Sequence, residues 1–270
     1  MADAPPPAAP RPDDARSDNA RSDESRLERR RRQCRVSQRR YRDKKSSQEY
    51  NLVLDVNQLR ERVDDWQAAA AAAHKAVQQY YDVFRHGLHN PEAGGDAVRQ
   101  CFDLQVNFLH AFMDQDVCFG RWRGITTVVQ HWQRYTTFFE ELTWELETAE
   151  VVGAKTEPVV VVEGELTVTV SWAALENIFP LALENDALAE QLLGCQLVCP
   201  TSSMYAFNER LQVVRAETQI NYLFGLNAVL GDSRLTAQVL GAAHIAESLV
   251  IGNQDDGNDQ LDASNRDQQQ

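Results

Sequence analysis

Between Asp23 and His86 this chain contains neither proline nor glycine. These two residues interrupt helices more than any others, proline because it removes an N–H and clashes with the preceding turn, glycine because it loses the most backbone entropy. The stretch is instead dominated by Ala, Arg, Gln, Glu and Leu, which favour helices. It therefore predicts one or two long helices over residues 23–86. Residues typical of a helix end follow it: Gly87, Asn90, Pro91, Gly94 and Gly95.

Positive charge is concentrated inside this stretch. Residues 26–45 hold nine Arg and two Lys against Glu28 and Asp43, which is a net charge of +9. Because the whole chain carries −13, the remaining residues carry −22. Such an asymmetry indicates a tethered arm that binds a polyanion rather than a generally basic surface. The release of counterions from phosphates is enough to give such an arm sequence-independent affinity for nucleic acid.

On a helix, five side chains of the basic run share one face, because they follow the spacing i, i+3, i+4, i+7 and i+8. A helix fits the major groove of DNA, so this face is predicted to read base edges while the flanking cations contact phosphates. The predicted base-reading residues are Cys34, Ser37, Gln38, Tyr41 and Arg42. The predicted phosphate contacts are Arg30, Arg31, Arg35, Arg39, Arg40, Lys44 and Lys45. On the basic run alone, a nuclear-localisation patch or an unspecific RNA-binding arm remains an alternative.

A heptad pattern follows the basic run. Valine at a with leucine at d favours a parallel two-stranded coiled coil. In that register Asp55 at g faces Arg60 at e of a second copy, so a homodimer is allowed, as is a heterodimer. The run from Ala68 to Ala73 offers little to bury, so this short zipper is expected to need help from DNA or from the C-terminal domain. The predicted dimerisation residues are Leu52, Val56, Leu59, Val63 and Trp66.

The spacing of these residues resembles the basic leucine zipper (bZIP) family. Its pattern is an Asn, an Arg eight residues later and the first zipper Leu ten further on; here those positions are Cys34, Arg42 and Leu52. Cys in place of Asn is similar to the variant bZIPs of oomycete type. The resemblance implies a nuclear transcription regulator that binds double-stranded DNA as a homodimer or as a heterodimer with another bZIP. Because a thiol is a weak donor where the amide both donates and accepts, the base preference at Cys34 is expected to differ from the family's.

The C-terminal two-thirds is predicted to be an α+β domain. Amphipathic patterns indicate helices around residues 77–88 and 98–112, then a hairpin or bent strand over 113–124 and a helix over 125–142. β-branched and alternating stretches predict strands at 144–152 and 158–172, with a bulge or turn at Glu163 and Gly164, and a final pair at 195–207 and 211–223. A helical insertion broken by Pro180 separates the two pairs, and two helices, the second capped by Asp232, close the domain.

This order of elements is similar to the NTF2-like (SnoaL-like) α+β cone with a curved antiparallel sheet. Such folds host enzymes, ligand-binding domains and dimerisation modules, so the resemblance allows a small-molecule ligand in the C-terminal domain. The alternative function is therefore an NTF2-like ligand-binding protein or small enzyme that carries a basic targeting helix. The zipper pattern favours the transcription regulator. A targeting peptide needs no hydrophobic seam, meaning the row of Leu52, Val56, Leu59 and Val63, at a fixed distance from Arg42.

The chain is expected to divide into four parts. A disordered tail covers 1–22, the bZIP segment covers 23–73 with its basic region at 26–45 and its zipper at 49–73, the α+β domain covers 74–251, and a disordered acidic and Gln-rich tail covers 252–270.

No set of residues predicts an enzyme. His86, His89, His110 and His131 are candidate bases, but they match no nucleophile elbow, phosphate loop or metal spacing, so no catalytic residue, metal or cofactor is expected. The candidate carboxylates are Asp103, Asp114, Asp116, Glu163, Glu165 and Glu217. Five scattered cysteines are expected to be reduced thiols, and neither a leader nor an apolar run long enough for a membrane span is recognised.

Overall fold

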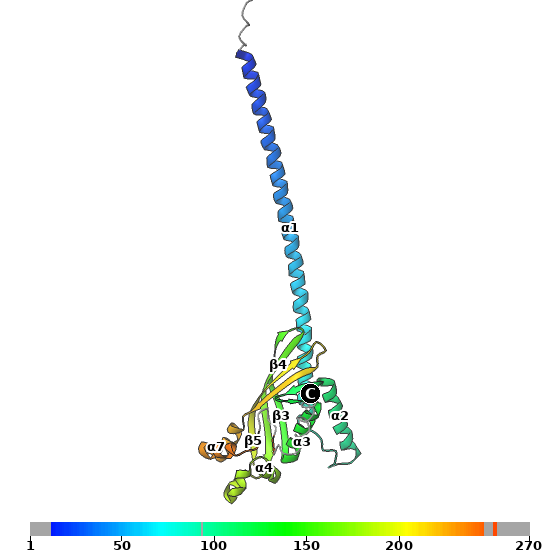
Figure 1. Ribbon diagram of the computed structural model, residues 1–270, viewed down its shortest axis with the longest axis vertical. Coiled ribbons are helices and arrows are strands. Elements are labelled where there is room, and N and C mark those ends of the chain that lie inside the picture. Colours follow the sequence, from blue (N-terminus) through cyan, green and yellow to red (C-terminus); the bar gives the residue numbers. More distant parts are fainter. Residues whose placement is uncertain (1–11, 93, 246–250, 253–270) are drawn as a thin grey trace, which may run out of the picture. The chain divides into compact units, whose positions relative to one another are not determined.

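The computed structural model describes residues 12–92, 94–245 and 251–252. A single helix, α1 (Pro12–Val83), takes up the predicted helical stretch (Figure 1). It begins earlier than predicted, so residues 12–22, which were expected to be disordered, are helical. A proline at the first helical position followed by two aspartates is a favourable helix start, since the N-terminal end of the helix dipole attracts negative charge. Residues 1–11 and 253–270, the rest of the two predicted disordered tails, lie outside the described residues.

The chain forms two compact units, Met1–Val63 and Asp64–Gln270, and α1 contributes to both. This division falls before the predicted boundary at residues 73 and 74, because residues from Asp65 onward already contact the domain. The run of alanines was predicted to bury little, yet Ala70 is only 8% exposed and Ala73 is fully buried. Part of the predicted zipper extension therefore belongs to the domain core.

The domain is built on one six-stranded sheet with the strand order β2-β1-β6-β5-β4-β3. All neighbouring strands are antiparallel except β1 and β6, which are parallel, so the predicted antiparallel sheet is in fact mixed. No hairpin joins β1 to β6, and their relative direction is therefore free of the constraint that a short turn imposes. The strands are β1 (Met113–Phe119), β2 (Trp122–Arg123), β3 (Phe139–Ala154), β4 (Glu157–Val170), β5 (Gln196–Phe207) and β6 (Val213–Ile220).

The predicted strand pairs are confirmed, but the bulge predicted at Glu163 and Gly164 lies on the neighbouring strand β3, where Glu147 is the extra residue. Between Leu146 and Thr148 the pairing of β3 with β4 shifts by one residue opposite Gly164. A Cβ on Gly164 would lie 2.2 Å from the carbonyl oxygen of Glu145, so only glycine fits this close approach. The helix predicted over 125–142 ends at Phe138, and its last residues start β3. The strand predicted over 158–172 ends at Val170, and Trp172 starts α4.

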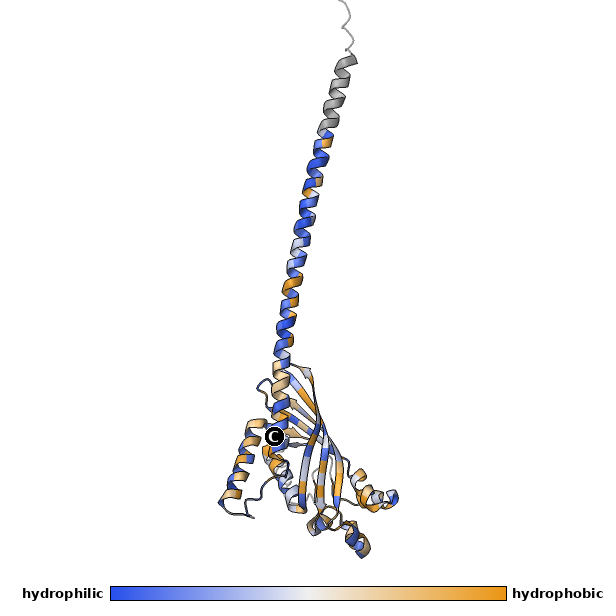
Figure 2. Cartoon of the chain, turned by 180° about the vertical axis from the view of Figure 1, so that it is seen from behind, coloured by the Kyte–Doolittle hydropathy of each residue, from blue (hydrophilic) through white to orange (hydrophobic). Residues whose placement is uncertain are grey.

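Helices pack against this sheet and carry the rest of the core. Figure 1 shows α2 and α3 beside the sheet, and Figure 2 shows how hydrophobic and hydrophilic residues alternate along the strands. The insertion broken by Pro180 is confirmed as three short helical segments, and Asp232 caps the last helix as predicted. The helices are α2 (Asp96–Phe112), α3 (Ile125–Phe138), α4 (Trp172–Asn177), the 3-10 helix η1 (Pro180–Glu184), α5 (Asp186–Leu192), α6 (Tyr222–Leu230) and α7 (Ser233–Gly241).

A buried glutamine holds the C-terminal end of α1. The Gln105 side chain on α2 donates from Nε2 to the carbonyl oxygens of Val83 and Gly87, both at 2.9 Å. Its Oε1 accepts from the backbone N–H of His89 at 2.9 Å. Helix ends leave carbonyl groups without partners, and a buried carbonyl without a hydrogen bond is costly. Gln105 therefore ties the end of the long helix to α2.

Replacing Gln105 by leucine is expected to destabilise the domain by about 3 kcal/mol, because each buried backbone group left unpaired costs roughly 1–3 kcal/mol. Gln100→Leu, on an exposed position of the same helix, is the matched control and should leave the free energy of unfolding nearly unchanged. Urea denaturation of both variants measures the difference. Equal stabilities for the two variants would show that water replaces the amide at no cost.

Candidate nucleic-acid interface

The predicted DNA-binding residues all lie on one uninterrupted and fully exposed part of α1. Every side chain from Ser25 to Val63 is exposed, including the hydrophobic Tyr41 at 69%. The helix therefore carries the predicted base-reading and phosphate-contacting side chains without using them for packing within its own chain. No observation tests their contacts with DNA, and the assignment of each residue stays a prediction.

The electrostatics of this part of α1 favour an anionic partner. Arg39 pairs with Asp43 at 4.0 Å and Lys45 with Glu49 at 3.8 Å, both one helical turn apart and exposed. Exposed pairs of this kind add little stability. Arg31, Arg35 and Arg39 repel one another at the same spacing, which destabilises an isolated helix. A polyanion that neutralises these side chains would stabilise the helix that binds it.

The predicted zipper seam lies on the same exposed part of the helix. Leu52, Val56, Leu59 and Val63 are 63%, 38%, 55% and 53% exposed. Four large hydrophobic side chains at heptad spacing and without cover within the chain are typical of a helix that pairs with another.

Trp66, the fifth predicted seam residue, is partly engaged within its own domain. It is only partly exposed, and its Nε1 donates to the carbonyl oxygen of Gly153 at 3.0 Å. Next to it, Lys155 Nζ donates to Asp65 Oδ2 at 2.5 Å. The sequence held no signal for these contacts, because Trp66 and Gly153 are 87 residues apart. Of the five predicted dimerisation residues, Trp66 is the one whose side chain has a hydrogen-bond partner among the described residues.

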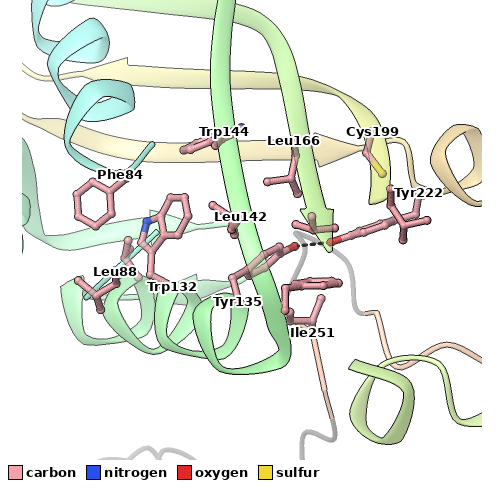
Figure 3. Close-up of a cluster of buried hydrophobic side chains, with 14 of the residues drawn as sticks. Phe84, Leu88, Trp132, Tyr135, Leu142, Trp144, Leu166, Cys199, Tyr222 and Ile251 are labelled. Carbon is pink, nitrogen blue, oxygen red and sulfur yellow. Dashed lines mark hydrogen bonds between the residues drawn. The ribbon is translucent and has the colours of Figure 1, made fainter. Parts of the chain in front are cut away.

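Aromatic and aliphatic side chains pack together in the domain core, part of which is shown in Figure 3. Trp132 Nε1 donates to Tyr80 Oη at 3.0 Å, and the hydroxyls of Tyr135 and Tyr222 share a hydrogen bond of 2.9 Å. Burial raises the pKa of each of these three tyrosines above its usual value, so their hydroxyls stay neutral. A cavity of about 20 Å³ remains beside them, which is about the room of one water molecule.

His131 lies against this cavity. Its Nδ1 is buried and has no hydrogen-bond partner among the described residues. Burial, followed by the positive charge of Arg134, lowers the pKa of His131 from 6.5 to about 3. Its ring contacts those of Phe119 and Tyr135, each with centroids 4.8 Å away. His131 is thus a buried and neutral residue of the domain core.

The remaining candidate catalytic residues do not converge. His86 Nδ1 lies 3.2 Å from the carbonyl oxygen of Leu142, His89 pairs with Gln105, and His110 is exposed on α2. Glu163 accepts a hydrogen bond from Ser202 on the neighbouring strand. Across residues 12–92, 94–245 and 251–252, no three His, Cys, Asp or Glu side chains are grouped so as to hold a metal ion. Within the same ranges, none of the helices is both long and apolar enough to cross a membrane.

One segment of the chain matches a known protein family. Residues 74–138 match the bZIP transcription factor 1 C-terminal domain. The predicted resemblance to a bZIP transcription factor is confirmed by this match, which adjoins the basic helix and begins where the zipper was expected to end. The matched segment contains the last turns of α1, the whole of α2 and α3, and the β1–β2 hairpin. No curated protein matches the chain.

Solved structures with some likeness to the chain include three bacterial proteins. TsrD from Streptomyces laurentii has a TM-score of 0.40 and 12% identity, and the match covers 60% of this chain and 96% of TsrD. A SnoaL-like polyketide cyclase from Agrobacterium tumefaciens has a TM-score of 0.39 and 14% identity, covering 59% and 98%. IdmH, a putative polyketide cyclase from Streptomyces antibioticus, has a TM-score of 0.39 and 13% identity, covering 59% and 99%. The assignment to the α+β class rests on the strand order and not on these likenesses.

Proposed function

We propose that this chain is a nuclear, non-enzymatic transcription regulator that binds double-stranded DNA as a dimer and reads a specific sequence. The observation that carries the proposal is that one exposed helix presents a basic face and a hydrophobic heptad seam in phase, ten residues from Arg42 to Leu52. The match of the adjoining segment to a domain of a bZIP transcription factor supports it.

The charge of the helix supplies the affinity for DNA. Residues 26–45 carry +9, and a helix of this width fits the major groove. Two such helices would diverge from the zipper and enter the major groove on opposite sides of the duplex. In bZIP proteins, the distance between the basic region and the first zipper leucine fixes where the two helices separate. Neutralisation of the arginines would release counterions, so binding should weaken steeply with salt.

Specificity would come from the face with Cys34, Ser37, Gln38, Tyr41 and Arg42. Arg42 is the residue in the family pattern best suited to read guanine, because a guanidinium can donate two hydrogen bonds to its O6 and N7. Cys34 stands where the pattern has an amide, and its thiol can contact a base only weakly. The recognised sequence should therefore differ from that of a bZIP with Asn at this position.

Small-molecule binding or catalysis in the domain receives no comparable support. The cavity inside the core beside His131 has room for about one water molecule, far below the several hundred Å³ typical of ligand sites. A larger hollow of about 430 Å³, lined by Arg85, Trp144 and Glu145 among others, is mostly polar, whereas ligand sites are mostly apolar. The domain is instead proposed to hold the C-terminal part of α1, whose Ala73, Val77 and Tyr80 are buried in its core.

Selection of bound duplexes from random sequences, followed by titration of Arg42→Ala and Lys45→Ala, tests the proposal. Arg42→Ala should weaken binding to the selected duplex by about 1–3 kcal/mol, because a bidentate base contact is lost. It should weaken binding to random duplex much less. Lys45→Ala, which removes a predicted phosphate contact on the same helix, should weaken both equally. Selection that recovers no common sequence would refute specific recognition, and equal losses for Arg42→Ala on both duplexes would make Arg42 a phosphate contact.

A further inference from the structure

The helical face that forms the predicted zipper seam continues, in the heptad count, into the domain core. Counting on from Leu52 to Val63, the next a and d positions are Trp66, Ala70, Ala73, Val77, Tyr80 and Phe84. The last five of these are between 0% and 8% exposed, whereas the four positions before Trp66 are between 38% and 63% exposed. The side chains at the a and d positions are therefore exposed in the first two heptads and buried in the next two.

The change occurs at Trp66. The turn between β3 and β4 contacts the helix there, through the bond from Trp66 to Gly153 and the ion pair of Asp65 with Lys155. Beyond it, Tyr80 stacks on Phe112 with ring centroids 5.0 Å apart, and Phe84 stacks on Trp132 at 5.2 Å. A second helix that followed this face would have to displace these side chains from the core.

We propose that a second copy of this chain pairs with α1 only over residues 52–63, and that the chain's own domain covers the same face of the helix from Trp66 onward. This inference rests on the proposed dimer, and it adds the residue at which the pairing of the two helices ends. A second copy fits the exposed face because Asp55 at g and Arg60 at e are complementary between parallel copies, and both are exposed.

The short seam has a consequence for regulation. Two heptads are close to the lower limit for a helix pair in water, so the dimer should dissociate on dilution. DNA that binds both basic helices would hold the copies together at concentrations where the free chain is monomeric. DNA binding should then depend steeply on the concentration of the chain.

Disulfide trapping with two pairs of cysteine variants tests where the pairing ends. Val63→Cys and Ala70→Cys compare consecutive a positions, and Leu59→Cys and Trp66→Cys compare consecutive d positions. All four are made in a Cys34→Ser, Cys101→Ser chain, which removes the two exposed native thiols. A disulfide requires Cα atoms within about 7 Å, so it forms only where the two helices face each other. Each chain is oxidised with and without duplex DNA, and the covalent dimer is measured on a non-reducing gel.

Val63→Cys and Leu59→Cys should give a covalent dimer. Ala70→Cys and Trp66→Cys should give little or none. Equal crosslinking within both pairs would overturn the inference, because the zipper would then continue along α1. Circular dichroism and thermal unfolding show whether each variant folds. If Ala70→Cys does not fold, the comparison of Leu59→Cys with Trp66→Cys still tests where the pairing ends. Crosslinking at none of the four positions overturns the inference as well. In that case, sedimentation with duplex DNA that gives one chain per duplex also refutes the proposed dimer, and two chains per duplex move the interface away from the zipper.

Discussion

A chain with Leu59→Pro is expected to lose both its dimer and its binding to DNA. Proline removes a helical hydrogen bond and clashes with the preceding turn, at a cost of about 3 kcal/mol or more for each helix. The break falls inside the exposed seam, between the basic region and the domain. Sedimentation measures the dimer, and a gel-shift titration measures binding. The domain from Asp64 onward should keep its thermal transition, because Leu59 lies in the other compact unit.

Two leucines on the same helix provide a matched control for the seam. Leu59→Ala removes a d side chain without breaking the helix, and Leu54→Ala removes an exposed leucine of the same kind from outside the a and d positions. Only the first should weaken the dimer. A dimer that survives Leu59→Pro with an unchanged sedimentation mass would show that the C-terminal domain makes it.

The domain should lose stability in mild acid because of His131. Its pKa is 6.5 in the unfolded chain and about 3 in the folded protein. Above pH 6.5 both states are neutral at this residue and it adds no pH dependence. Below that, the unfolded chain takes up a proton that the folded one excludes, so stability falls by up to about 1.4 kcal/mol per pH unit until the folded pKa is reached.

Denaturation at pH 7 and at pH 5 measures this effect. Between these values the wild type should lose about 2 kcal/mol more than His131→Leu, which cannot take up a proton. His110→Leu, at an exposed position on α2, should behave like the wild type. If the wild type and His131→Leu lose the same amount, the folded protein must protonate His131 or hold its Nδ1 with a partner.

Patterns of short range were sufficient for much of the fold. The helix from residue 23 to its end at Val83 follows from composition and the absence of Pro and Gly, and the strands β3 to β6 follow from alternation along the chain. The phase between Arg42 and Leu52 is also a property of the sequence, because a helix places residues on faces by spacing alone. Gly164 marked the right place in the sheet, but the extra residue of the bulge, Glu147, lies on the partner strand β3, which a local pattern in β4 could not show.

Contacts between distant residues account for what the patterns missed. The last residues of the predicted 125–142 helix became β3 because Phe139 pairs with Val170 in the sheet. Gln105 lies 22 residues from Val83, and only the fold brings it to the end of α1. Neither partner lies within the few residues over which a periodic pattern carries information.

The sequence by itself determined that this protein carries one long helix with a basic face and a heptad seam, since both are repeats of three to four residues along a single element. Only the tertiary structure decided where that seam stops being available to another chain. The heptad pattern runs unchanged from Leu52 to Phe84, and the difference between its exposed and buried halves depends on the β3–β4 turn, which meets the helix at Trp66 from 87 residues away.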